Sequence, residues 1–142
     1  MYQIDKPKVF LSDEIDHLKD YVALEKMRFH DTLSVDMEVD VENRNELIAP
    51  MLLIPFVENS FKHGSIIDGQ LYIKIKIVSL QGALKFMVSN YSSPIHGKSV
   101  GIGLENLKKR LEIAYKNNHS LNIYHENNSF NVSLEIFNLN EA

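Results

Sequence analysis

The sequence predicts an α+β fold, a two-layer sandwich in which helices cover one face of a mixed, mostly antiparallel sheet. Two observations predict it. Apolar residues recur at helical spacing in three separate segments, and they alternate with polar residues in several others. The elements follow in the order helix, strand, helix, hairpin, helix, hairpin, with no internal repeat. This order places strands and helices in separate layers of one domain.

The composition is that of a soluble globular domain. The chain has 142 residues, 44% of them hydrophobic and 24% charged, with no run of the roughly 20 apolar residues that a membrane helix needs. There is no cysteine, no secretion signal at the start, and no pair of histidines at helical spacing, so disulfides and a zinc site are not expected. The net charge of −4 argues against nucleic acid as a partner.

The first half of the chain begins with a helix and a strand. Ser12 is a suitable N-cap, Asp13 and Glu14 place negative charge in the first turn, and helical spacing of apolar residues continues to about Phe29. The segment 32–41 alternates apolar and polar residues and predicts a half-exposed strand. Segment 42–46 is a polar connection.

Prolines divide the next helical zone, which spans residues 47–63. Because proline is tolerated only in a first turn, we expect a break at Pro50 and a regular helix from about Pro55. A loop over 64–70 leads into a hairpin. The last helix and the second hairpin follow a further loop. The predicted ranges are strands 71–79 and 83–90, loop 91–100, helix 104–115, and strands 120–126 and 129–137.

The segment FVENSFKHG, residues 56–64, carries many polar groups on a helix that is otherwise apolar. Helical spacing places Asn59, Lys62 and His63 on one face. The Asn59 oxygen can complete the coordination of Mg²⁺ beside phosphates, and the Lys62 ammonium can contact phosphate oxygens. The alternative is a solvated helix end that Gly64 terminates.

The segment GIGLEN, residues 101–106, precedes the last helix. Glycines allow backbone N–H groups to approach a ligand, and a helix N-terminus favours phosphate. Because the spacing is not GxGxxG, an ordinary turn remains the alternative.

Together, PMLLIPFVENSFKHG and GIGLENLKKRL resemble the ATP-binding domain of LytS-like sensor histidine kinases, which belong to the GHKL superfamily and have the Bergerat-type fold. LSDEIDHLKDYVALEKMRF resembles the helix that joins the phosphoacceptor region to this domain in that family. The resemblance implies ATP and Mg²⁺ as ligands. It also implies two parts, a linker helix over 1–30 and the ATP-binding domain over 31–142.

The resemblance implies a role for individual residues. Asn59 matches the asparagine that holds Mg²⁺, and Asn90 stands at the position that reads adenine. Glu58 and Arg110 match supporting positions of the two motifs. The other implied ATP contacts are Lys62, His63, Gly101, Ile102, Gly103, Leu104 and Asn106, with the two glycines acting as hinges of a lid. No catalytic residue beyond this ATP site is implied.

Two departures from the family pattern stand out. Asn90 replaces the usual aspartate, and no glycine follows it until Gly97, so the lid over 91–100 is short and ATP binding is expected to be weaker. None of the histidines lies in a phosphoacceptor context. We therefore expect a catalytic domain cut from a longer, membrane-anchored homodimer. The phosphoacceptor histidine would lie on a separate dimerisation helix, the domain would face the cytoplasm, and a response regulator would be the partner.

Three alternatives remain at this point. A degenerate domain of the same fold could serve as a scaffold without nucleotide. An anti-sigma-type serine kinase would use the same nucleotide pocket on a protein substrate. An unrelated α+β interaction domain would leave both motifs unexplained.

Overall fold

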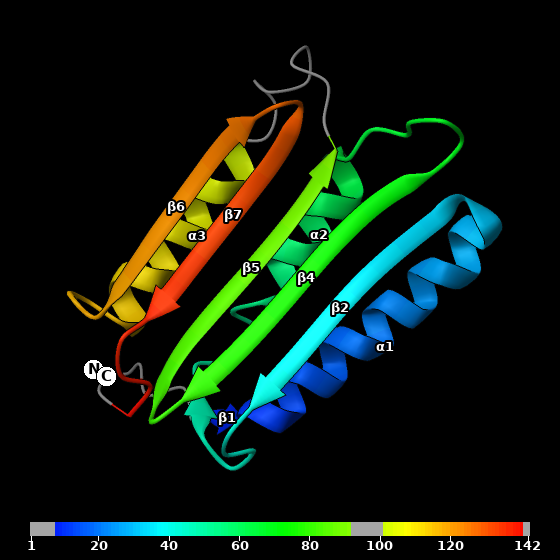
Figure 1. Cartoon of the computed structure of the whole chain (residues 1–142). Helices are drawn as coiled ribbons and strands as arrows, with labels where there is room; N and C mark the ends of the chain where they lie inside the picture. Colours follow the sequence, from blue (N-terminus) through cyan, green and yellow to red (C-terminus); the bar gives the residue numbers. More distant parts are fainter. Residues whose placement is uncertain (1–7, 92–100, 141–142) are drawn as a thin grey trace.

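The computed structural model describes residues 8–91 and 101–140, and the side chains of α3 from Leu104 onward. It has two layers, a five-stranded sheet and helices on one of its faces (Figure 1). The elements are β1 (Val9–Phe10), α1 (Leu11–Phe29), the short 3-10 helix η1 (His30–Thr32), β2 (Leu33–Val41), β3 (Leu47–Ile48), α2 (Ile54–His63), β4 (Leu71–Leu80), β5 (Ala83–Tyr91), α3 (Gly101–Ala114), β6 (His119–Glu126) and β7 (Ser129–Ile136).

The sheet has the strand order β2-β4-β5-β7-β6. Only the β2–β4 pair is parallel, and the other three pairs are antiparallel. Both hairpins form as predicted, and the predicted fold class is confirmed. None of the helices that the structure describes is long and apolar enough to cross a membrane.

The core lies between the sheet and the helices. On β4, Ile73, Ile75 and Ile77 are buried, whereas Lys74 and Lys76 point to the open face of the sheet. This alternation follows from the period of two in the sequence. The helices lie in the order α1, α2, α3 across the covered face, so α2 is in the middle and contacts both of the others (Figure 1).

The start of α1 differs from the sequence prediction. Phe10, not Ser12, is the N-cap residue, and it makes no side-chain capping bond. The preceding strand β1 pairs with β3, which brings the segment before β3 next to the helix start. There the backbone N–H groups of Leu11 and Ser12 donate to the carbonyl oxygens of Glu46 and Arg44, at 2.7 and 3.3 Å. The capping role of Ser12 is therefore taken over by backbone carbonyls.

Glu14 lies in the first turn of α1, as predicted, and it has a second role that the sequence does not show. Its side chain is only 2% exposed, and it faces the start of α2 instead of its own helix terminus. Its carboxylate accepts backbone N–H groups from Met51 (3.2 Å), Leu52 (2.9 Å) and Leu53 (3.1 Å). These three residues lie in the connection just before α2, so Glu14 attaches α1 to the segment that leads into α2.

The connection over residues 49–53, which leads into α2, is also held by α3. The Ala49 N–H donates to the hydroxyl of Tyr115 at 3.0 Å, and the Arg110 guanidinium donates to the Pro50 carbonyl at 3.0 Å. All three helices are thus joined through this 49–53 connection. The break predicted at Pro50 and the helix start near Pro55 are both confirmed.

The last helix begins earlier than predicted. α3 starts at Gly101, not near Leu104, so the glycine segment forms its first turn. The prediction was wrong because glycine disfavours helix interiors, although the first turn of a helix tolerates it. The loop predicted over 91–100 lies outside the described residues from 92 onward. The turn of the last hairpin is formed by Asn127 and Asn128, with φ of 52° and 62°, as expected for a two-residue hairpin turn.

We expect the substitution Glu14→Ala to lower the free energy of unfolding by about 2–4 kcal/mol, because it leaves three N–H groups of the connection before α2 without an acceptor. Urea denaturation measures this loss. The control Asp13→Ala removes the neighbouring exposed carboxylate and should change stability by less than about 0.5 kcal/mol. Equal effects of the two substitutions would contradict this role of Glu14.

Candidate functional site

Three elements that are distant in the sequence meet at one end of the domain. The end of α2, the end of β5 and the start of α3 lie there together, at the top of Figure 1. A backbone hydrogen bond of 2.8 Å from the Ser65 N–H to the Tyr91 carbonyl joins the end of α2 to the end of β5. This end of the domain therefore brings together both sequence segments that carry polar motifs.

Gly64 allows α2 to approach the sheet closely at this end. A Cβ atom at this position would lie 2.6 Å from Leu71 Cδ1 and 2.8 Å from the Ser60 carbonyl oxygen. Its φ of −69° is open to any residue, and Gly64 is the C-cap of α2, as the sequence indicated. Glycine is required here for the close packing, which places the end of α2 against β4 and β5.

Asn90 lies at the end of β5 on the covered face of the sheet, and only 3% of it is exposed. Its Nδ2 atom donates to the Tyr91 carbonyl at 3.0 Å. Its Oδ1 atom is buried without a hydrogen-bond partner. Since buried polar atoms are nearly always paired, this oxygen is a candidate acceptor for a ligand.

Asn59 lies on α2, turned away from α1. Phe61 packs against Tyr21 of α1, with ring centroids 5.5 Å apart, and a residue two positions earlier in a helix lies on the opposite side. Asn59 is half-buried, and its Nδ2 atom is buried without a partner. The two ends of the Asn59 amide point in different directions. Since the nitrogen is the buried end, the oxygen is the end that a ligand could contact. Lys62 is exposed and His63 half-buried on the following turn.

Glu58 is separated from Asn59 although the two are adjacent in sequence. It is exposed and acts electrostatically on Tyr21, on the α1 side of α2. Burial raises the pKa of the Tyr21 phenol to about 12, and the carboxylates of Glu25 and Glu58 add to this effect. Glu25 is held by the Arg28 guanidinium through two contacts of 3.1 Å each. The structure thus places Glu58 with the α1 cluster, on the other side of α2 from Asn59.

The remaining candidates lie along α3. Gly101, Ile102 and Gly103 form its first turn at the end where α2 and β5 finish. Leu104 is 3% exposed and belongs to the hydrophobic core. Asn106 is exposed, and Arg110 is bonded to the Pro50 carbonyl near the start of α2. Of these residues, the structure therefore brings the first turn of α3 to the site and places Arg110 at the 49–53 connection.

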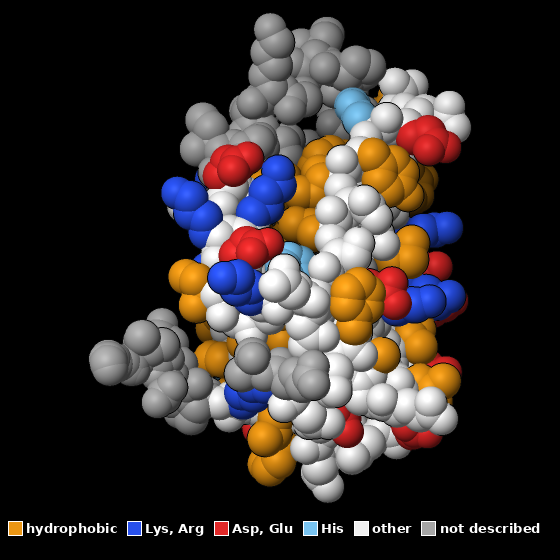
Figure 2. Space-filling view, turned by 90° about the vertical axis from the view of Figure 1, so that its left-hand side faces the viewer, with side chains coloured by type: hydrophobic (Ala, Val, Ile, Leu, Met, Phe, Trp, Pro, Cys, Tyr) orange, Lys and Arg blue, Asp and Glu red, His pale blue; other side chains and the backbone are white. Residues whose placement is uncertain are grey.

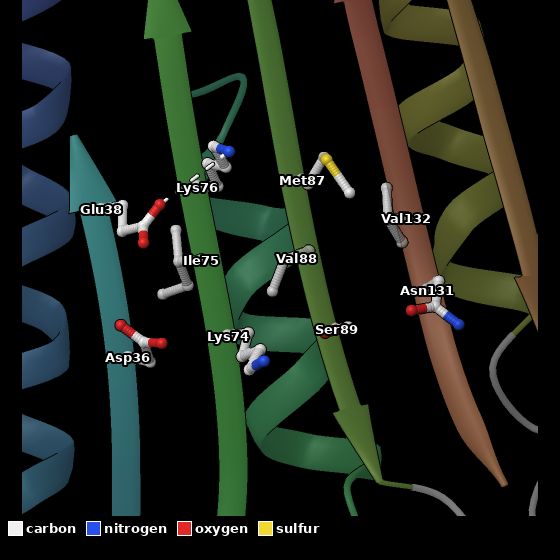
Figure 3. Close-up of a pocket in the computed structure, with 10 residues that line it drawn as sticks. All are labelled: Asp36, Glu38, Lys74, Ile75, Lys76, Met87, Val88, Ser89, Asn131 and Val132. Carbon is white, nitrogen blue, oxygen red and sulfur yellow. Dashed lines mark ion pairs between the residues drawn. The ribbon is translucent and has the colours of Figure 1, made fainter. Parts of the chain in front are cut away.

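A separate hollow of about 200 Å³ lies on the open face of the sheet, opposite the helices. Figure 3 shows charged side chains of β2 and β4 beside it, including Glu38 and Lys76, whose carboxylate and ammonium are 3.9 Å apart. Met87 of β5 also lines it. None of the residues predicted to bind a ligand lines this hollow, so it is not the site that the motifs form.

The side of the molecule formed by α3 and β6 carries charges of both signs (Figure 2). Glu105 and Lys108 of α3 form an exposed pair at 3.4 Å. Within residues 8–91 and 101–140, no three histidine or acidic side chains gather as a metal-binding group.

Comparison with known proteins adds to this geometry. No protein-family model matches the chain. Over 56 residues the chain is 38% identical to the sensor protein kinase HptS of Staphylococcus aureus, and this match covers 39% of the chain and 11% of the relative. The chain thus spans about one tenth of the length of the curated relatives it matches.

Solved structures match over nearly the whole chain. The nucleotide-free catalytic domain of histidine kinase ThkA superimposes with a TM-score of 0.64 at 16% identity, over 92% of this chain and 94% of that one. The chain has the fold of a histidine kinase catalytic domain. Full-length ShkA in complex with AMPPNP matches with a TM-score of 0.64 at 12% identity, over 99% of this chain and 33% of that one. ThkA in complex with the response regulator protein TrrA matches with a TM-score of 0.61 at 15% identity, over 92% of this chain and 41% of that one.

The sequence relatives are named sensor protein kinases, and the structural neighbours are named histidine kinases. Sequence reasoning missed the contact that Glu14 makes and the Tyr21–Glu25 cluster. The burial of Glu14 could have been predicted from helical spacing, because Glu14 lies on the same face of α1 as the buried residues Leu11 and Leu18.

We expect the Tyr21 phenol to titrate near pH 12, because burial and the nearby carboxylates of Glu25 and Glu58 raise its pKa. The folded pKa lies above the ordinary value of about 10, so the folded state holds this proton more tightly than the unfolded state does. Its contribution to stability is therefore complete below about pH 10 and is lost as pH rises toward 12.

Ultraviolet titration and denaturation at several alkaline pH values measure both effects. Tyr21→Phe should remove the late titration and the matching loss of stability. Glu25→Gln should shift the titration of Tyr21 to lower pH. A Tyr21 phenol that titrates near pH 10, the ordinary value for tyrosine, would contradict the arrangement.

Proposed function

We propose that the chain is the Mg-ATP-binding catalytic domain of a LytS-like sensor histidine kinase. In this proposal it supplies the γ-phosphate of ATP to a histidine on a separate dimerisation helix of the full-length protein. A single observation carries the proposal. Asn59, Asn90 and the first turn of α3 lie around one end of the domain, and two of their buried amide atoms have no partner in the described structure.

The residues present fit a nucleotide at this end. The Asn90 oxygen is a buried acceptor, suited to an amino group of a base. The first turn of α3 supplies backbone N–H groups and the positive end of a helix dipole, suited to phosphate. Lys62 is exposed near the end of α2, where its ammonium would contact phosphate oxygens. The AMPPNP complex of ShkA, which has a similar fold, supports the same ligand class.

Asn59 would hold Mg²⁺ through its side-chain oxygen, together with phosphate oxygens and water. When bound, the ion would neutralise charge on the phosphates during phosphoryl transfer. The chain's own residues orient the nucleotide. The Gly64 contact and the Glu14 contact keep α2, and with it Asn59, in a fixed position relative to Asn90 on the sheet.

The wider assignments belong to the same proposal. Residues 1–30 would link the domain to the phosphoacceptor region, and residues 31–142 would form the ATP-binding part. A response regulator would receive the phosphoryl group, as suggested by the solved ThkA–TrrA complex. The full-length protein would be a homodimer anchored in the inner membrane, with this domain on the cytoplasmic side. His63 and Asn106 would support the site, whereas Glu58 and Arg110 lie away from it.

We expect Asn59→Ala to weaken Mg-ATP binding by at least about tenfold, because a charge-assisted contact is worth about 1.5–3 kcal/mol. Calorimetric titration of the chain with Mg-ATP measures the affinity. The exposed Asn122 on β6 provides a matched control, and Asn122→Ala should bind Mg-ATP like the unsubstituted chain.

Circular dichroism should show that both variants keep the fold. Unchanged affinity in Asn59→Ala would refute Asn59 as the residue that holds the metal. A thermal shift test with Mg-ATP separates a kinase domain from a scaffold that binds no nucleotide, since a ligand at 100 times its Kd adds about 2.7 kcal/mol of stability. No shift at millimolar Mg-ATP would favour the scaffold.

A further inference from the structure

We propose that strand β6 is a dimerisation edge, at which a second copy of this chain adds its own β6 in antiparallel orientation and joins the two sheets into one. The inference does not rest on the proposed function, because β6 carries none of the residues assigned to the nucleotide site. In a full-length homodimer this edge would give the two copies a contact outside the dimerisation helix.

β6 is the outermost strand of the sheet on the side of α3. In the sheet that the structure describes it pairs with β7 alone, over eight consecutive residue pairs from His119 and Ile136 to Glu126 and Ser129. Among the described residues, no backbone hydrogen bond from another part of the fold reaches segment 119–126. The outer N–H and C=O groups of β6 therefore form a row to which another strand can bind.

The sequence of β6 does not protect this edge. Proteins usually protect an edge strand with charged residues, a proline or a bulge that hinders pairing with another chain. β6 contains no proline, lysine or arginine, its one acidic residue is Glu126 at the last position, and its pairing with β7 is continuous. Its eight residues also make it longer than the usual strand of about five or six. β6 is thus an edge of the kind that accepts a further strand.

The opposite edge of the sheet is protected. β2 carries Asp36, Glu38 and Asp40 at alternate positions, all of them exposed. Two β2 strands placed side by side would bring these carboxylates together, and like charges on paired strands destabilise the pair. Pairing of β6 with β2 of another copy would repeat without closing and would produce a filament. The difference between the edges therefore favours a closed, two-fold dimer through β6.

Figure 2 faces this side of the molecule. Charged side chains gather to the left, over α3, where Glu105 and Lys108 form an exposed pair, and again to the right, toward the open face of the sheet. The band between these two groups is mainly white and orange. A second strand can therefore approach this edge without meeting a row of charges.

β6 is complementary to itself in antiparallel orientation. Because side chains alternate between the two faces, each residue must lie opposite one on the same face. In the register centred on Asn122, its amide lies opposite the same amide of the second copy, and each can donate and accept. Leu121, which packs against the core, lies opposite Ile123 of the second copy, which does the same. The Glu126 carboxylates lie at opposite ends of the paired strands and do not meet.

Self-pairing would also bury apolar surface that is now accessible. Leu121 and Ile123 are only half-buried at the margin of the core, because the sheet ends at β6. A second β6 would cover both side chains in each copy. Since one strand pair buries less than the roughly 1,200–2,000 Å² of a standard interface, the dimer should be weak and should form at high concentration.

Sedimentation equilibrium of the whole chain, from micromolar to millimolar concentration, measures this association. The unsubstituted chain should change from monomer to dimer, with no larger species, because a two-fold contact closes. The double variant Asn122→Glu/Tyr124→Glu gives β6 acidic residues at alternate positions, as β2 has, and should dimerise at least about tenfold more weakly. The control Ser34→Glu/Asn45→Glu adds the same charge at exposed positions away from β6 and should dimerise like the unsubstituted chain.

Cysteine cross-linking tests the position of the contact. The chain has no cysteine, so a single introduced thiol reports on its own surroundings. Asn122→Cys places two thiols opposite each other across the two-fold axis, with Cβ atoms about 4.5–5.5 Å apart, and oxidation should link the copies. Ser34→Cys on the protected edge β2 should stay monomeric under the same conditions. This assay decides the question even if the double glutamate variant does not fold.

Three outcomes would overturn the inference. The first is a chain that stays monomeric at millimolar concentration. The second is a dimer that keeps its full affinity in Asn122→Glu/Tyr124→Glu, and the third is cross-linking no faster with Asn122→Cys than with Ser34→Cys. In the last two cases the copies would meet at another surface. None of these measurements involves nucleotide, so their failure leaves the proposed function in place.

Discussion

The carboxylate of Glu14 is the contact on which the arrangement of the helices depends. A buried carboxylate is costly unless hydrogen bonds compensate for the lost water, and here three backbone N–H groups of the 49–53 connection do so. Because those groups lead directly into α2, the contact sets the position of α2 relative to α1. Arg110 and Tyr115 attach α3 to the same connection. The helix that carries Asn59 is thus positioned from both sides.

This arrangement explains why the candidate site lies at the opposite end of α2. With its start held by Glu14 and its end packed on the sheet through Gly64, α2 has little freedom to slide. Asn59 on the helix and Asn90 on β5 can then keep fixed positions before any ligand arrives, which reduces the cost of ordering the site on binding. The open face of the sheet has its own hollow but lacks such buried, unpaired polar atoms among the described residues lining it.

Much of the fold could be predicted from sequence, and the reasons are physical. The strands β2 and β4 could be predicted because one face of each strand is apolar and the other polar. The start of α2 could be predicted because proline is tolerated only in the first turn of a helix, where Pro55 lies. The strands β1 and β3 have two residues each, too few for any periodicity. The start of α3 was misplaced because its first turn contains two glycines.

The site was harder to predict, because adjacent residues of a helix point in different directions. Glu58 and Asn59 formed one motif in sequence, yet the structure turns them to opposite sides of α2. Glu14 was assigned to its own helix terminus, since sequence spacing does not show which segment packs above a side chain. The bond from Asn90 to the Tyr91 carbonyl depends on the α2–β5 junction, which no local pattern encodes.

The most direct test of the central claim is the position of ligand-induced changes in the amide spectrum of the chain. Titration with Mg-AMPPNP, followed by two-dimensional NMR, should shift amide signals in 59–65, 90–91 and 101–106, where α2, β5 and α3 meet. Signals of Glu38, Lys76 and Met87 beside the open-face hollow should stay in place. Shifts centred on that hollow, or none at saturating nucleotide, would contradict the account.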